Sequence, residues 1–329
     1  MTPAPDLRGY AGVRAVVLGA SGFIGRWAGH ALTGAGAELH AVVRDVAEAR
    51  RVFANYGVTA QVHEADLTDF EQTRRLLLRL APAIVFNLSG YGVDPGERTE
   101  GSDRLAGVLN ADLPGMLAKS LAAIPAPGWA GRRIVHVGSI LEYGQIGGHL
   151  EESSAAAPFN LYGRSKLAGT LRLTEACESA ALPGLTARLC QVYGPGEHPG
   201  RLLPMLIEAR GHTQPLSLSI GTQSKDFTYV GDVAEGLLRL GLTAGGPGEV
   251  VNLASGRLDT VREFTLTAAH LLRLEPGRLK FEKPLPDNEL QHLEVATDRL
   301  RTLTDWVPAT TLADGIRRTL DFLDRRSDG

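Results

Sequence analysis

The stretch Gly19-Ala20-Ser21-Gly22-Phe23-Ile24-Gly25 decides the fold of this chain, because it joins an apolar strand-like run, Arg14–Leu18, to a segment with helical periodicity. Glycines at such a junction let the backbone turn sharply and approach a pyrophosphate. The free N–H groups and the positive end of the helix dipole then stabilise the pyrophosphate charge. The motif, spaced GxxGxxG, therefore predicts a dinucleotide site with contacts from Gly19, Ser21, Gly22, Phe23, Ile24 and Gly25.

Strand-like and helix-like segments alternate around and beyond this motif. Strands are predicted at 14–18, 38–43, 83–88, 133–137 and 186–192, and helices from 24, from 46, and over 105–123 and 162–180. This order is typical of an α/β fold with a doubly wound parallel Rossmann sheet. After Gly194 prolines become frequent, and helices are predicted at 261–274 and 312–323. We therefore expect residues 1–190 to form the dinucleotide-binding domain. Most of residues 191–329 should form a smaller, interleaved C-terminal substrate domain, and segment 226–255 should return to the first domain.

Composition limits the classes of function. The 329 residues include 34 basic and 37 acidic side chains, a net charge of -3, so no electrostatic attraction to nucleic acid or an anionic membrane is expected. Two cysteines, neither paired at metal-ligand spacing, are typical of a reducing compartment. No apolar run is long enough for a membrane span or shaped like a signal peptide. We expect a cytoplasmic protein without nucleic-acid or membrane partners.

The coenzyme's adenosine ribose is expected to lie where the predicted strand 38–43 ends in Arg44-Asp45. A guanidinium there would pair with the 2′-phosphate of NADP, whereas a carboxylate would accept hydrogen bonds from the ribose hydroxyl of NAD. Arg44 comes first and favours NADP, with NAD through Asp45 as the alternative. A further alternative is that Arg44 is a solvated cation and Asp45 caps the next helix.

A further strand-like run ends at Asp66-Leu67. Thr68 and Glu71 have the spacing of a capping box, which accounts for these two residues but not for Asp66. The Asp66 carboxylate could accept a hydrogen bond from the adenine amino group. We therefore place Asp66 and Leu67 at the coenzyme's adenine.

Tyr162 and Lys166 are four residues apart and so share one face of a predicted helix. The ammonium can favour tyrosinate and lower a phenol pKa that is ordinarily about 10. Ser139 follows the predicted strand 133–137, and its hydroxyl can hold a substrate oxygen. We predict that Tyr162 transfers the proton while hydride passes between a sugar or steroid-like hydroxyl and nicotinamide, with Lys166 and Ser139 as its catalytic partners. No histidine pair or carboxylate cluster has metal spacing, so no metal is expected.

These residues resemble the extended short-chain dehydrogenases/reductases, the NAD-dependent epimerase/dehydratase family that acts on nucleotide sugars. The resemblance also includes GSILEYG (138–144), RLCQVYGPG (188–196), KDFTYVGDVA (225–234) and VNLASG (251–256). It implies a nucleotide-diphosphate sugar substrate and a homodimer formed through the helices at 105–123 and 162–180. It also implies coenzyme contacts from Leu88, Ser89, Asn110, Tyr162, Lys166 and Tyr193, with Asn110 supporting the active-site helix, and substrate contacts from Ser139, Gln191, Arg201 and Lys225.

Departures from the family pattern narrow the reaction. Family 4,6-dehydratases place an Asp-Glu pair where this chain has Ile140-Leu141, so dehydration is disfavoured. The pattern through Glu142 is similar to that of some 4-keto-6-deoxymannose reductases, although Glu142 could also be a supporting or surface carboxylate. Segment 285–289 lacks the Arg that usually binds the diphosphate. The leading hypothesis is an NADPH-linked reductase of a 4-keto nucleotide sugar; the alternatives are an epimerase with bound NAD and a non-enzymatic, coenzyme-sensing regulator.

Overall fold

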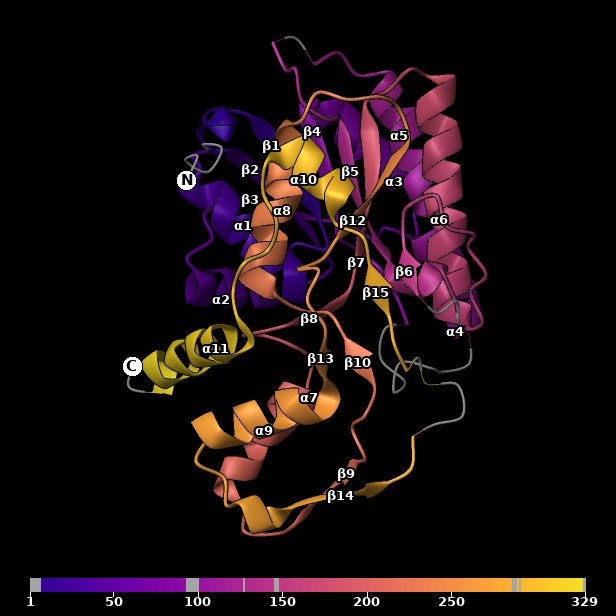
Figure 1. Cartoon of the computed structure of the whole chain (residues 1–329). Helices are drawn as coiled ribbons and strands as arrows, with labels where there is room; N and C mark the ends of the chain where they lie inside the picture. The colour runs from indigo at the N-terminus through magenta and orange to yellow at the C-terminus, as the bar shows by residue number, and fades with distance from the viewer. Residues whose placement is uncertain are drawn as a thin grey trace.

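The computed structural model describes residues 7–92, 101–126, 128–144, 148–285, 289 and 291–327. Its centre is a seven-stranded parallel sheet with the strand order β12-β7-β5-β4-β1-β2-β3 (Figure 1). The chain starts at β1 in the middle and builds the two sides of the sheet in turn, which is the doubly wound Rossmann arrangement. The strands are β1 (Arg14–Leu18), β2 (Glu38–Val43), β3 (Gln61–Glu64), β4 (Ile84–Asn87), β5 (Ile134–Ser139), β7 (Gly184–Leu189) and β12 (Glu249–Leu253).

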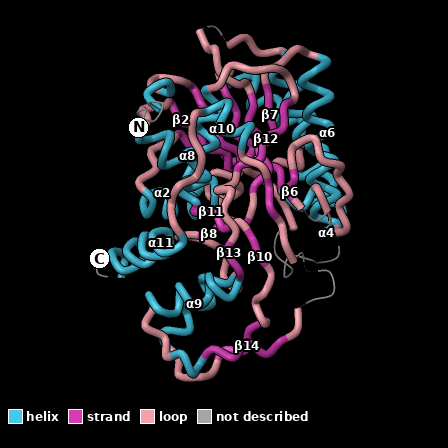
Figure 2. The backbone as a smooth tube through the Cα atoms, viewed as in Figure 1, coloured by secondary structure: helices cyan, strands magenta, loops and turns pink. Residues whose placement is uncertain are grey.

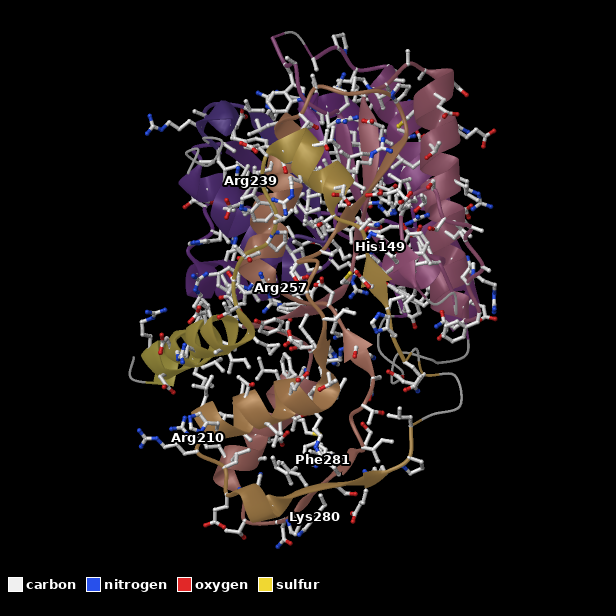
Figure 3. All side chains as sticks on the ribbon, viewed as in Figure 1. His149, Arg210, Arg239, Arg257, Lys280 and Phe281 are labelled. Carbon is white, nitrogen blue, oxygen red and sulfur yellow. The ribbon has the colours of Figure 1, made fainter. Side chains whose placement is uncertain are left out.

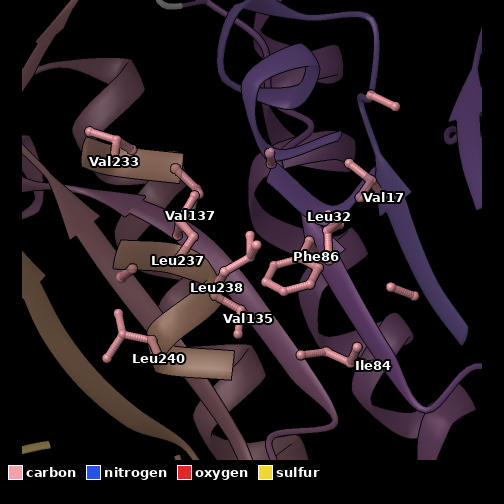
Figure 4. Close-up of a cluster of buried hydrophobic side chains, with 14 of the residues drawn as sticks. Val17, Leu32, Ile84, Phe86, Val135, Val137, Val233, Leu237, Leu238 and Leu240 are labelled. Atoms are coloured by element: carbon pink, nitrogen blue, oxygen red, sulfur yellow. The ribbon is translucent and has the colours of Figure 1, made fainter. Parts of the chain in front are cut away.

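Helices cover both faces of this sheet, so central strands such as β1 and β4 are buried on both sides and are largely apolar, whereas the edge strand β3 is partly exposed. In β1, Ala15 and Val17 face one hydrophobic core while Val16 and Leu18 face the other. Figure 4 shows the first core, in which Phe86 and Val135 meet side chains of α1 and α8. This face is covered by α1 (Phe23–Gly34), α2 (Val46–Tyr56) and α8 (Val230–Leu242), and the opposite face by α3 (Phe70–Leu80), α5 (Leu113–Ala122) and α6 (Leu161–Ser179).

The predicted helix at 105–123 has an irregular first half. The structure has α4 (Ser102–Ala106), then a π-helical turn, Gly107–Asp112, and only then α5. Widened turns of this kind are rare and are often found at functional sites.

The predicted strand 186–192 is two strands. β7 ends at Leu189 in the large sheet, and β8 (Gln191–Tyr193) leaves it to pair with β11 (Phe227–Tyr229). The prediction of one strand was therefore wrong at Cys190, where the chain passes out of the main sheet.

A smaller lobe with its own hydrophobic core follows β8, and Figure 2 shows its helices and strands beneath the sheet domain. Segment 230–253 returns to the first domain as α8 and β12. The remaining elements are β6 (His149–Leu150), α7 (Leu202–Glu208), β9 (Leu216–Ser219), β10 (Ser224–Lys225), β13 (Asp259–Thr260), α9 (Val261–Leu271), β14 (Leu279–Lys283), β15 (Glu294–Val295), α10 (Asp298–Thr304) and α11 (Leu312–Ser327).

Two buried aspartates accept hydrogen bonds from the backbone of the segments that connect the lobes. Asp232 of α8 accepts hydrogen bonds from the backbone N–H of Thr310 (2.8 Å) and of Ala309 (3.0 Å). Asp226 accepts from the backbone N–H of Gly256 (2.7 Å). Arg257, which lies between the lobes in Figure 3, donates to the Thr310 carbonyl (2.8 Å). Among the helices of the described residues, none combines the length and the apolar character that crossing a membrane requires.

Candidate active site

The glycine motif forms a tight cradle between β1 and α1. Gly19 has φ +73, a conformation that favours glycine. A Cβ on Gly25 would lie only 2.1 Å from the Gly19 carbonyl oxygen. Helix α1 begins at Phe23 with Gly22 as its N-cap, which has no side chain that could occupy the helix end. The cradle therefore fits a pyrophosphate, which would be bound by the N–H groups of the first helical turn. The side chains of Phe23 and Ile24 pack towards the smaller lobe.

The end of β4 lies directly against this cradle. A Cβ on Gly19 would lie 3.0 Å from the Leu88 carbonyl oxygen and 3.0 Å from the Ser89 backbone nitrogen. β1 and β4 are neighbours in the sheet at the point where the chain changes direction, and dinucleotides bind beyond the carboxyl ends of strands at such a point. The structure thus brings Leu88 and Ser89 to the predicted coenzyme site.

Arg26 is a residue that the sequence analysis missed. Its guanidinium donates to the carbonyl oxygens of Ser21 (2.9 Å) and Gly22 (3.0 Å), so it braces the glycine loop from outside. It also lies over the Tyr56 ring, 5.0 Å from the ring centroid. The sequence does contain a signal for this role, because a basic residue directly follows the third glycine. Position 26 is four residues after the N-cap, Gly22, and so lies on the same face of the helix.

At the adenosine end, Asp45 is the N-cap of α2 and accepts a hydrogen bond from the Glu48 N–H (2.9 Å). This is the capping role that was considered as an alternative. Arg44 is exposed next to it. Hydrogen bonds from Thr68 are the main cause of the lowered pKa of Asp66, and the positive charge of Arg44 contributes to it. Arg44 follows β2 and Asp66 follows the neighbouring β3, so both lie at the edge of the sheet where the adenosine is expected.

The expected capping box at Thr68 and Glu71 is wrong. Asp69 is the N-cap of α3 and accepts from the Gln72 N–H (2.9 Å), whereas the Thr68 hydroxyl donates to Asp66 (2.7 Å). Leu67 is buried in the core beneath α3, so any coenzyme contact at this residue would come from its backbone.

The three predicted catalytic residues lie on two elements that touch. Ser139 is the last residue of β5, and Tyr162 and Lys166 are in the first turns of α6. The Lys166 ammonium of α6 donates to the Val137 carbonyl of β5 (3.0 Å), and a Cβ on Gly163 of α6 would lie 2.5 Å from the carbonyl oxygen of Leu141, in the turn that follows β5. The Ser139 hydroxyl accepts from the Leu141 N–H (3.2 Å), so its own proton can be donated to a substrate oxygen.

Lys166 is buried beneath Tyr162. Its ammonium lies 5.9 Å from the centroid of the Tyr162 ring and donates to the Val137 carbonyl (3.0 Å). Burial lowers the pKa of Lys166 to about 8, and the nearby negative charge of Glu142 opposes that shift. The fraction of Lys166 that is protonated near neutral pH therefore depends on its burial and on the charge of Glu142.

Asn110 connects this helix to the end of β4. Its side chain is fully buried in the π-helical turn, accepts from the Tyr91 N–H (2.9 Å) and donates to the Tyr91 carbonyl (2.8 Å) and to the Ser165 hydroxyl (2.9 Å). A Cβ on Gly90 would lie 3.1 Å from the Lys166 ammonium. Asn110 therefore braces both α6 and the loop that passes Lys166, as the resemblance implied.

Besides Ser139, the predicted substrate residues lie on the segments that follow β7. The Gln191 N–H donates to the Asp226 carbonyl (3.0 Å), which brings Gln191 close to Lys225. Lys225 forms an ion pair with Glu289 (2.5 Å), and Arg201 is the N-cap of α7. Residues 286–288, in the segment that lacks the expected Arg, are outside the described residues.

Tyr193 differs from the expectation. Its side chain is buried in the core of the smaller lobe against Phe264 and Tyr229, and burial raises its pKa. Any contact with nicotinamide would have to come from the backbone of the turn that follows, in which Gly194 has φ +144.

The fold and this arrangement of side chains define a Rossmann-type oxidoreductase, and across the described ranges no group of three or more His, Cys, Asp or Glu side chains could hold a metal ion. A family model described as the NAD dependent epimerase/dehydratase family matches residues 15–254. The chain belongs to this family and is an NAD(P)-dependent enzyme of the short-chain dehydrogenase/reductase type.

Similar proteins include both dehydrogenases and epimerases. The chain is 30% identical over 321 residues to a dTDP-6-deoxy-L-talose 4-dehydrogenase (NAD(P)(+)) of Kitasatospora kifunensis, covering 92% of this chain and 93% of that protein. Its fold matches Epimerase Mth375 from Methanothermobacter thermautotrophicus with a TM-score of 0.84, at 22% identity and covering 98% and 95% of the two chains. It also matches a UDP-glucuronic acid 4-epimerase from Bacillus cereus in complex with UDP-glucuronic acid and NAD (TM-score 0.80, 21% identity, 95% and 99% covered).

Proposed function

We propose that this chain is an NADPH-linked reductase of a 4-keto nucleotide sugar. The observation that carries the proposal is the arrangement of Ser139, Tyr162 and Lys166 at the contact between β5 and α6. It is supported by the talose 4-dehydrogenase that the chain resembles over almost its full length.

The residues divide the work of reducing a ketone. When bound, the reduced coenzyme supplies the hydride. Tyr162 donates its phenolic proton to the carbonyl oxygen, so that the product is an alcohol. The Ser139 hydroxyl donates a hydrogen bond to the same oxygen and holds it beside Tyr162, and the Lys166 ammonium stabilises the tyrosinate that remains. Ile140 and Leu141 have no acid or base with which to remove water from the sugar.

NADP is the proposed coenzyme because the Asp45 carboxylate, which would otherwise bind the ribose hydroxyl of NAD, caps the N-terminus of α2. Its carboxylate accepts from the Glu48 N–H and is directed at the helix backbone. Arg44 is then the side chain at the end of β2 that can meet the ribose, and a guanidinium suits a 2′-phosphate.

The proposal is tested by what the purified protein retains and what it reduces. A reductase exchanges its coenzyme in every cycle, so denatured protein should release much less than one equivalent. NADPH oxidation should then depend on a 4-keto-6-deoxy sugar nucleotide. The alternative, an epimerase, recycles a bound coenzyme: one equivalent of released NAD, together with interconversion of UDP-sugars without added coenzyme, would refute the reductase and establish the epimerase.

The resemblance to the family makes a homodimer and a nucleotide-diphosphate sugar the expected partners. Lys225 is the proposed contact for the diphosphate, as a point charge and not a bidentate fork. Because Lys225 is paired with Glu289, the diphosphate would have to replace that carboxylate.

A further inference from the structure

The carboxylate of Glu142 is completely buried directly behind Ser139. One oxygen accepts from the Ser139 N–H (2.8 Å), and the other accepts from the Thr170 hydroxyl (3.0 Å) and the Arg188 Nε–H (2.9 Å). Each partner belongs to a different element, because Ser139 ends β5, Thr170 is in α6 and Arg188 is in β7.

The Glu142 carboxylate fits against β5 because the residue beside it, Gly138, has no side chain. A Cβ on Gly138 would lie 2.5 Å from the Glu142 Oε1, so the glycine before Ser139 is what allows the carboxylate to reach the strand. Arg188 is buried as well and lies over the Tyr143 ring, 4.3 Å from its centroid. The Tyr143 hydroxyl in turn donates to Asn252 (2.7 Å), so the partners of Glu142 are themselves held in place.

We propose that Glu142 is a positioning residue, whose buried carboxylate fixes Ser139 relative to the helix that carries Tyr162 and Lys166 and places a negative charge close to Lys166. The inference rests on the proposed function for its effect on turnover. Its effect on Lys166 is independent of the substrate.

Lys166 and Glu142 contact the same strand two residues apart, because the Lys166 ammonium donates to the Val137 carbonyl (3.0 Å) and the Glu142 carboxylate accepts from the Ser139 N–H (2.8 Å). The groups that face this region are His136 on β5, Arg188 on β7, Glu142 itself and Tyr162 one helical turn away. Burial, and next the charge of Lys166, hold the pKa of His136 well below its usual value, so His136 stays neutral. Arg188 is a permanent cation. Among these groups, Glu142 is the one whose negative charge raises the pKa of Lys166.

Two substitutions separate position from charge. Thr170→Val removes one hydroxyl that donates to Glu142 and changes no charge, whereas Glu142→Gln removes the negative charge and places an amide beside Arg188. We expect both variants to lower kcat about tenfold, because small misplacements of catalytic groups are costly. The Kd for NADPH should be unchanged in both, and Thr170→Ser, which keeps the hydroxyl, should restore kcat.

Lys166 itself is observed by NMR of protein labelled with 13Cε-lysine, which is practical because the chain has only five lysines. The Lys166 signal, assigned with Lys166→Arg, should titrate at a lower pH in Glu142→Gln than in the parent and at the parent pH in Thr170→Val. An unchanged midpoint in Glu142→Gln, or an unchanged kcat in Thr170→Val, would overturn the proposal.

Two complications leave the proposal testable. If Glu142→Gln does not fold, Thr170→Val and Thr170→Ser still decide whether the link to α6 matters. If the parent reduces no 4-keto sugar nucleotide, the proposed function fails, and the NMR titration still decides whether Glu142 controls Lys166.

Discussion

The phenol of Tyr162 and the ammonium of Lys166 are one helical turn apart, and the ammonium is buried. Tyr162→Phe removes the proton donor and leaves the ring, so turnover should fall by roughly 10² to 10⁴, the usual contribution of a general acid–base group. The Kd for NADPH should remain within a few-fold of the parent, since the pyrophosphate cradle is on a different helix. A variant that keeps most of the parent turnover would mean that another group supplies the proton.

Arg44 gives a second prediction for a single residue. A charge-assisted hydrogen bond between its guanidinium and a 2′-phosphate is worth about 1.5 to 3 kcal/mol, enough for a tenfold or larger preference for NADPH over NADH. Arg44→Ala should remove most of that preference by raising the Kd for NADPH alone. Arg51→Ala, which removes an exposed cation from α2, is the matched control and should keep the preference. A parent that binds NADH more tightly would show that Arg44 does not read the ribose.

At the scale of elements, β2 and β3 are joined by a pair of histidines. His40 Nδ1 lies 2.8 Å from His63 Nε2, and the two rings are stacked with centroids 5.1 Å apart. Burial, followed by the charges of His40 and Arg79, lowers the pKa of His63 in the folded protein. The unfolded chain, with a histidine pKa of about 6.5, therefore binds more protons than the folded chain as the pH falls below that value.

The sign of the pH effect on stability follows from this. The free energy of unfolding should be highest above the unfolded pKa of about 6.5 and should decrease as the pH falls through the folded pKa of His63. His63→Gln keeps a polar contact with His40, and it should flatten this decrease in denaturant titrations between neutral and mildly acidic pH. His212→Gln, at an exposed position, should keep the parent slope. Buried His136 also lowers the free energy of unfolding at acidic pH, by the same amount in all three proteins. Identical slopes in all three proteins would show that the pair does not titrate as described.

Elements defined by local patterns were predicted well from the sequence, and elements defined by distant partners were not. Strands β1 and β2 have the predicted bounds, because an apolar run next to the glycine motif or a cap marks each end. Thr68 and Asp69 were confused, because each has Glu71 or Gln72 three residues later, and the choice depends on the contact that Asp66 makes with Thr68. The spacing alone contains no information on that contact.

The site shows the same division. Tyr162 and Lys166 were found because they are neighbours on one helix, and Ser139 because it ends a predicted strand. The partners of Glu142 could not be found in this way, since Thr170 is 28 residues away and Arg188 is 46 residues away along the chain. Only the packing of α6 against β5 and β7 brings them together.

For the whole molecule, the outer surface of α5 and α6 is where a second copy is expected. Leu171 is 60% exposed on α6, and Leu78 is 40% exposed on α3, which packs against α5. Near them is a cavity of about 590 Å³, lined by residues of α3, α5 and α6 that include Arg74, Met116 and Lys119. The two exposed leucines and the hollow, which has both charged and apolar lining side chains, lie on one face, where a second copy could cover them.

Light scattering at micromolar concentration tests this dimer. The parent should have twice the mass of one chain, and Leu171→Glu should be monomeric because it would bury an unpaired charge. Leu266→Glu changes a comparably exposed leucine on α9 of the smaller lobe and should remain dimeric. A monomeric parent would contradict the predicted assembly.

The contact between α11 and the first two helices has an optical consequence. The Trp27 indole donates to the Pro195 carbonyl (2.9 Å), and its ring meets Tyr56 and Phe322, with centroids 5.4 and 5.5 Å away. Trp27 follows Arg26 in α1, so one fluorophore lies next to the glycine cradle and against the last helix of the smaller lobe. Replacing Trp129 and Trp306 by Phe would leave it as the single emitter, because the chain has three tryptophans. Reduced nicotinamide absorbs at the wavelengths at which tryptophan emits, so quenching of Trp27 by energy transfer would report binding of the coenzyme. A shift in the emission maximum would report movement of the lobes. Both signals could be followed in real time and without a substrate.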